Sequence, residues 1–109
     1  MIQYIRDHYN DVTLKEMADY FGFSTPYLSK YIKQKTGETF GNLVKNVRMK
    51  KACYLLKSTN LLVEDIAKTV GYQTIEHFNR TFKKDYEVTP VQYRNGKRKK
   101  DQKGKNYEK

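Results

Sequence analysis

The chain has 109 residues, of which 38% are hydrophobic and 14% aromatic. This length allows one domain with or without a tail, and the composition is too apolar for a disordered protein. No apolar run approaches the ~18 residues that span a bilayer. The N-terminus is polar from its third residue, so we expect no signal peptide. A single cysteine permits no internal disulfide and fits a reducing cytoplasm.

The charge balance is strongly basic. Lys and Arg number 22 against 12 acidic residues, a formal charge of +10, and residues 97–109 hold seven basic and two acidic side chains. Such a balance favours polyanionic partners, nucleic acid first and anionic membrane second. A solubilising surface would have the same total, so charge alone does not decide. We expect residues 96–109 to form a basic flexible tail that contributes only non-specific attraction.

The chain contains an internal repeat. Residues 14–23 (LKEMADYFGF) align with residues 63–72 (VEDIAKTVGY) at an offset of 49, and the alignment continues after one extra residue in the second copy. Matching on both sides of a single insertion is improbable by chance, so we expect two copies of one structural unit. The aligned pairs include Met17 and Ile66, Ala18 and Ala67, Gly22 and Gly71, Leu28 and Phe78, and Ile32 and Phe82.

The first copy has the pattern of two helices joined by a tight turn. Thr13 followed by Glu16 predicts a capping box at the start of the first helix. Gly22 is suited to end this helix, because a left-handed terminal residue is favoured without a Cβ. Ser24 is expected to cap the second helix, which Gly37 ends. The apolar residues of the first helix recur at helical spacing and predict a buried stripe of Leu14, Met17, Ala18 and Phe21.

The second copy repeats this plan with one departure. Leu62 stands where the first copy has Thr13, so the second unit lacks the capping box, and Asn60 is a candidate cap one turn earlier. In both copies a small alanine and a glycine allow two short helices to cross steeply. This spacing is typical of the DNA-binding helix-turn-helix. A helical hairpin in a bundle is the alternative, which two copies on a basic chain make less favourable.

The motifs of the second half resemble a known family. They are Ile66-Ala67-x-x-Val70-Gly71-Tyr72, Phe78-Asn79-Arg80-x-Phe82-Lys83 and Thr89-Pro90-x-x-Tyr93-Arg94. Together with the order of the elements, they resemble the DNA-binding domain of the AraC/XylS family of bacterial transcription regulators over roughly residues 3–95. The resemblance implies an all-α fold of seven helices, a double helix-turn-helix in which a long linker helix joins two lobes.

Mapped onto this chain, the seven helices are expected at residues 2–9, 14–20, 25–36, 39–57, 63–69, 75–85 and 90–94. The DNA-binding domain would then span residues 1–95, with the first helix-turn-helix at about 13–36, the linker helix at about 39–57 and the second helix-turn-helix at about 62–85. A linker of some nineteen residues would be roughly 28 Å long. Within it, Arg48 matches an arginine of the family, and we favour a structural role closing on acids between the lobes over a phosphate contact.

The second helix of each unit is expected to enter the major groove. By the resemblance, the base contacts map to Pro26, Ser29, Lys30, Ile75, Glu76, Asn79 and Arg80. Side chains expected to contact phosphates are Thr25, Lys33, Thr74, Thr81, Lys83 and Lys84. For each charged residue the alternative is an ordinary solvated helix face.

The chemistry of these side chains suits base edges. Arg80 and Lys30 can donate to guanine O6 and N7, whereas Asn79 can pair with adenine N6 and N7. Glu76 can accept from a cytosine amine. Only apolar contact, for instance with a thymine methyl, is open to Pro26 and Ile75.

Other kinds of site have little support. His8 and His77 lie far apart without carboxylates or thiols at ligand spacing, so we expect no metal. His77 is expected at the groove side or in helix packing, and Cys53 in packing of the linker helix. No catalytic residues, cofactor or Gly-rich phosphate loop are expected. The ten tyrosines are spread along helices and do not cluster on strands as in binders of single strands.

The sequence therefore predicts sequence-specific binding to double-stranded DNA by a cytoplasmic, nucleoid-associated regulator without catalysis. The resemblance implies RNA polymerase as a further partner and a sensing or receiver domain that this chain lacks. Two alternatives remain. A basic membrane-surface or RNA-binding protein would show no preference for duplex DNA, and a protein-interaction bundle would not bind DNA at any salt concentration.

Overall fold

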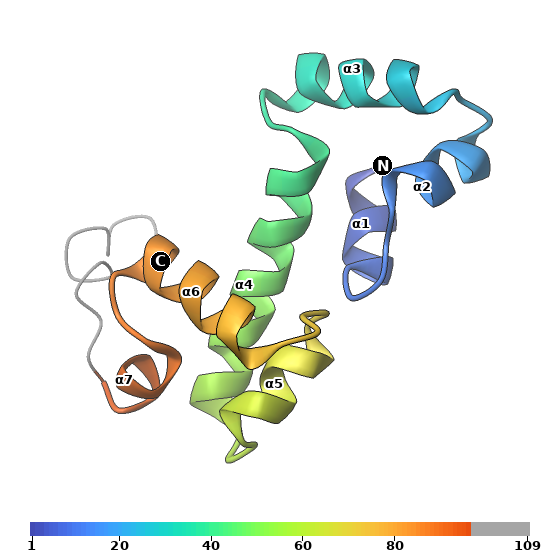
Figure 1. Ribbon diagram of the computed structural model, residues 1–109. Helices are drawn as coiled ribbons and strands as arrows, with labels where there is room; N and C mark the ends of the chain where they lie inside the picture. Colours follow the sequence, from blue (N-terminus) through green and yellow to red (C-terminus); the bar gives the residue numbers. More distant parts are fainter. Residues whose placement is uncertain (97–109) are drawn as a thin grey trace. The chain divides into compact units, whose positions relative to one another are not determined.

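The computed structural model describes residues 1–96, and residues 97–109 of the predicted tail lie outside the described residues. The described part folds into seven helices without a strand (Figure 1). The predicted all-α class is confirmed, and each helix begins and ends within one residue of its expected position. The helices are α1 (Ile2–His8), α2 (Leu14–Phe21), α3 (Thr25–Thr36), α4 (Phe40–Ser58), α5 (Val63–Thr69), α6 (Ile75–Tyr86) and α7 (Pro90–Arg94).

The chain divides into two compact units, and the boundary falls within α4. Unit 1 comprises Met1–Arg48, and unit 2 begins at Met49. Unit 1 therefore holds the first copy of the repeat and the start of α4, while unit 2 holds the rest of α4 and the second copy.

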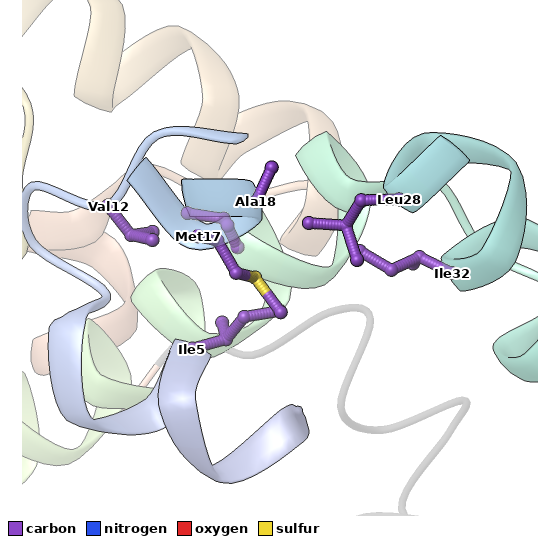
Figure 2. Packing of buried hydrophobic residues seen from close by; sticks show 7 residues of the cluster. Ile5, Val12, Met17, Ala18, Leu28 and Ile32 are labelled. Atoms are coloured by element: carbon purple, nitrogen blue, oxygen red, sulfur yellow. The ribbon is translucent and has the colours of Figure 1, made fainter. Parts of the chain in front are cut away.

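The core of unit 1 is built from the predicted apolar stripes. Figure 2 shows Met17 and Ala18 of α2 meeting Leu28 and Ile32 of α3, with Ile5 of α1 close to Met17. All five side chains are at most 2% exposed. Burial at this level stabilises by about 1.5–3 kcal/mol for each large aliphatic side chain. The full cluster is Ile5, Val12, Met17, Ala18, Leu28, Ile32 and Val44.

Arg48, near the middle of α4, contacts the residue that follows α1 within unit 1. Its Nε donates to the carbonyl oxygen of Tyr9 at 2.7 Å, and the side chain is half-buried. This contact supports the structural role favoured for Arg48. This contact is made with a backbone carbonyl, and the expected contact of Arg48 with acidic residues stays a prediction.

Unit 2 buries a corresponding core in which aromatic rings replace aliphatic side chains. Phe82 of α6 lies 5.5 Å from the ring of Tyr93 and 4.7 Å from that of Tyr86, measured between centroids. Arg94 of α7 donates from Nε to the carbonyl oxygen of Leu56 at 3.0 Å and from Nη2 to that of Thr59 at 3.2 Å. Since carbonyls at a helix C-terminus lack partners within the helix, Arg94 satisfies the end of α4.

The helix starts are capped largely as the sequence predicts. The Thr13 hydroxyl accepts the Glu16 N–H at 3.1 Å at the start of α2, which is one of the two bonds of the predicted capping box. The complete box, with both bonds, forms between Thr89 and Gln92 at the start of α7. Leu62 precedes α5 and makes no side-chain cap bond, so the expected lack of a cap is confirmed and the Asn60 alternative is wrong. The hydroxyls of Ser24, Thr74 and Thr89 cap α3, α6 and α7.

The two turns inside the repeats close with the same hydrogen bonds. Phe23 donates to Ala18 and Tyr72 to Ala67, both at 2.9 Å, from backbone N–H to backbone carbonyl. The second helices of the two copies have different C-cap residues. The C-cap of α3 is Gly37 with φ 79°, whereas that of α6 is Glu87 with φ 65°. Glu87 is the one non-glycine residue with positive φ among residues 1–96, and a left-handed conformation is costly for such a residue.

Alanine substitution of two glycines should have opposite effects on stability. Gly22 ends α2 with φ 77°, so we expect Gly22→Ala to lower the free energy of unfolding by about 1 kcal/mol. Gly41 is the second residue of α4, where the backbone is already helical, and Gly41→Ala should raise it by about 0.4–1 kcal/mol. A Cβ at either position meets no atom within 4 Å, so backbone conformation alone separates the two variants. Urea denaturation of both variants measures the difference, and equal effects would contradict the role of the turn.

Candidate nucleic-acid interface

The rotation of α3 about its axis follows from two buried side chains. Leu28 and Ile32 are 0% and 2% exposed and lie on the same helix face. The other side of a helix then faces outward. All five candidate contact residues of this helix are exposed: Thr25, Pro26, Ser29, Lys30 and Lys33.

Lys33 has an additional contact at the end of its own helix. Its Nζ lies 3.3 Å from the carbonyl oxygen of Gly37, to which it donates. An ammonium group carries three donors, so this bond leaves capacity for a phosphate oxygen. A positive charge here also interacts favourably with the helix C-terminus.

The second unit positions α6 in the same way. Phe78 and Phe82 are both 0% exposed, which turns Glu76 and Arg80 outward. Ile75 and Asn79 are half-buried, so they lie at the edge of the outward face. Among the predicted phosphate contacts of this unit, Thr81 is half-buried, while the exposed ones are Thr74, Lys83 and Lys84.

The N-cap of α6 is itself a predicted phosphate contact. The Thr74 hydroxyl oxygen accepts the His77 N–H at 3.1 Å. A hydroxyl has one hydrogen to donate in addition to its acceptor lone pairs. The Thr74 hydroxyl can therefore cap the helix as an acceptor and at the same time donate to a phosphate oxygen.

Tyr27 is exposed on the outward face of α3 and is not among the contact residues that the sequence predicts. Its ring is 53% exposed and lies 6.1 Å from that of Tyr31, at an interplanar angle of 23°. The corresponding residue of α6, His77, is exposed and meets Tyr72 edge-on at 5.0 Å. The contact with Tyr72 supports the packing role expected for His77, and its groove-side role stays a prediction. In the sequence, Tyr27 directly precedes Leu28 and His77 directly precedes Phe78. Because Leu28 and Phe78 are predicted to be buried, this position could have indicated that Tyr27 and His77 lie beside the outward face.

The two outward faces differ in charge. α3 carries Lys30, Lys33 and Lys35 and no acidic residue. The outward face of α6 carries Arg80, Lys83 and Lys84, which are opposed there by Glu76, whereas the half-buried Asp85 lies on the side of Phe78 and Phe82. On the outward face of α3 no carboxylate opposes the attraction of phosphates, whereas Glu76 opposes it on α6.

Two other kinds of site can be checked within residues 1–96. No three His, Cys, Asp or Glu side chains in this range come together as metal ligands. None of the helices in this range is long and apolar enough to cross a membrane.

Comparison with known proteins supports the geometry. A family model described as "Helix-turn-helix domain" matches residues 17–96. The xylose operon regulatory protein of Escherichia coli K12 is 34% identical over 94 residues, which are 85% of this chain and 24% of that protein. The chain thus spans about a quarter of the length of that curated relative.

Solved structures show the same fold. The C-terminal domain of AraT, a response regulator from Geobacillus stearothermophilus, matches with a TM-score of 0.82 and 44% identity, over 86% of this chain and 79% of that one. A transcriptional regulator from Chromobacterium violaceum, described as an AraC-type DNA-binding domain-containing protein, matches with a TM-score of 0.80, over 88% of this chain and 87% of that one. Its identity is 22%, so this second likeness concerns the fold alone.

The cap of α6 can be tested by substitution. Thr74→Ala removes the oxygen that accepts the His77 N–H, and we expect the free energy of unfolding to fall by about 1 kcal/mol. Thr74→Ser keeps this oxygen and should retain most of the stability. Thermal or urea unfolding of both variants is the measurement, and an alanine variant as stable as the serine variant would show that the cap contributes nothing.

Proposed function

Because the chain belongs to the AraC/XylS family of helix-turn-helix transcription regulators, as its DNA-binding domain, we propose that both units bind double-stranded DNA sequence-specifically. The observation that carries this proposal is the duplication. Each unit has the same closed turn and a capped second helix whose outer face remains exposed. Each second helix would lie in a major groove, and the two would occupy successive grooves.

The proposed base contacts follow from side-chain chemistry. Lys30 and Arg80 would donate to guanine, Asn79 would pair with adenine, and Glu76 would accept from cytosine. Ser29 would donate to or accept from a base edge, whereas Pro26 and Ile75 would contact a thymine methyl. Supporting this assignment, the side chains of Pro26, Ser29, Lys30, Glu76 and Arg80 are exposed.

The proposed phosphate contacts flank these residues and would orient each helix without reporting base identity. Exposure supports all of them except Thr81, which is half-buried at the flank of Phe82. The set is Thr25, Lys33, Thr74, Thr81, Lys83 and Lys84.

The chain would act by binding alone, in the cytoplasm and on the nucleoid, without catalysis. In the complete protein we expect a sensing or receiver domain, because the matched relative is about four times longer and the AraT domain belongs to a response regulator. RNA polymerase is the expected further partner of a regulator bound at a promoter.

Substitution of Arg80 should change specificity. If Arg80 donates to a guanine, Arg80→Ala should weaken the cognate site by about 1–3 kcal/mol and relax discrimination at one base pair. Lys83→Ala is the matched control, since loss of a phosphate contact should weaken all duplexes alike. Binding titrations on the cognate duplex and on single-base variants measure both effects. Unchanged affinity and preference in Arg80→Ala would mean that α6 is oriented differently on DNA.

A single chain should suffice for a complete site. Successive major grooves on one side of DNA lie about 34 Å apart. The groove-facing residues also differ between the copies, with Pro26, Ser29 and Lys30 against Glu76, Asn79 and Arg80. We therefore expect an asymmetric site of roughly 20 bp with two short, different blocks one turn apart. Footprinting and the stoichiometry of the complex test this, and a palindrome occupied only by two chains would refute it.

A further inference from the structure

An exposed group of aromatic rings lies on α1 and α2, away from either second helix in the sequence. We call Tyr4, His8, Tyr20 and Phe21 the ring cluster. Tyr20 is 70% exposed, yet its ring centroid is 4.8 Å from that of Tyr4 and 4.9 Å from that of Phe21. Figure 1 shows α1 and α2 close together within unit 1, in agreement with these distances.

The ring cluster is anchored by the hydrophobic core of unit 1. Tyr4 and Phe21 are partly buried and pack against the hydrophobic core of unit 1. The His8 ring stacks on Tyr4 at 4.3 Å, and its Nδ1 lies 2.9 Å from the Tyr4 carbonyl oxygen. Because its neighbours are anchored, Tyr20 offers a preorganised aromatic surface, and docking on it orders few side chains.

The charge around the ring cluster is opposite to that of the chain as a whole. Residues 1–19 hold four acidic and two basic side chains, a formal charge of −2 in a chain of +10. Glu16 lies one helical turn before Tyr20, and Asp7 one turn after Tyr4. Asp19 is paired with Lys15 at 3.4 Å, and because this pair is exposed it is weak enough for another cation to replace Lys15. This surface therefore disfavours phosphate and favours a cationic partner.

We propose that the ring cluster docks a partner protein that presents arginine side chains. A guanidinium group stacks on an aromatic face while its N–H groups pair with carboxylates, and arginine does this better than lysine. Tyr20 supplies the exposed face, which Tyr4 and Phe21 hold in place, and Asp7, Glu16 and Asp19 supply the carboxylates. The surface goes beyond DNA binding, because it offers a protein contact on helices separate from the two that would enter the grooves.

The test is a titration of the full chain with a hexa-arginine peptide whose ends are capped, and the ring resonances of the chain are followed by NMR. We expect the ring resonances of Tyr4, His8 and Tyr20 to shift on titration, with a weaker response to hexa-lysine. Tyr20→Ala should weaken binding of the arginine peptide about tenfold. Tyr54→Ala is the matched control, because Tyr54 is 62% exposed but has the Lys51 ammonium 5.5 Å from its ring centroid. It should leave binding unchanged.

Three outcomes would overturn the proposal. In one, the arginine peptide leaves the ring resonances unmoved. In another, the rings shift with protein concentration alone, and the occupant is a second copy of the chain. In the third, Tyr20→Ala loses affinity for duplex DNA selected with the unchanged chain, and the surface belongs to the DNA interface. If the unchanged chain binds no duplex at all, the proposed function fails while the peptide titration still decides on the ring cluster.

Discussion

The arrangement of both candidate interfaces depends on the burial of two side chains, one turn apart, on the second helix of each unit. Leu28 and Ile32 fix the rotation of α3, and Phe78 fixes that of α6 together with Phe82. Burying either pair of side chains contributes several kcal/mol to the free energy of unfolding. This is far more than any single exposed contact on the same helix contributes. The identity of the outward residues is consequently free to differ between the copies, because the fold does not depend on them.

The two copies reach this common arrangement by different local means. The first begins with a threonine cap and ends α3 at Gly37, so its boundaries are set by backbone preferences. The second has no side-chain cap on α5 and ends α6 at Glu87 in a left-handed conformation. Unit 2 instead gains the bonds of Arg94 to the end of α4 and ring contacts of Phe82 with α7. Tertiary contacts thus stabilise helix ends that local sequence leaves weak.

Local patterns predicted the helices well because their signals lie within a few residues of each other. Thr13, Ser24 and Gly22 act on neighbouring backbone groups, and each was assigned correctly. The Arg94 bonds join residues 35 and 38 positions apart, and no local pattern indicates them. The outward face of α3 followed from helical periodicity, but the ring cluster did not, since Tyr4 and Tyr20 come together only when α1 packs beside α2. Which outward side chain meets which base depends on the DNA and is not encoded in the fold.

The central claim is that two copies of one unit differ in specificity only through their outward residues. The direct measurement transfers the outward residues of α3 to α6 with five substitutions, Ile75→Thr, Glu76→Pro, His77→Tyr, Asn79→Ser and Arg80→Lys. Proline is tolerated in the first turn of a helix, where α3 itself carries Pro26. Selection of bound sequences from a random duplex pool should then yield sites in which one short block occurs twice. Sites that keep two different blocks, as expected of the unchanged chain, would contradict the account.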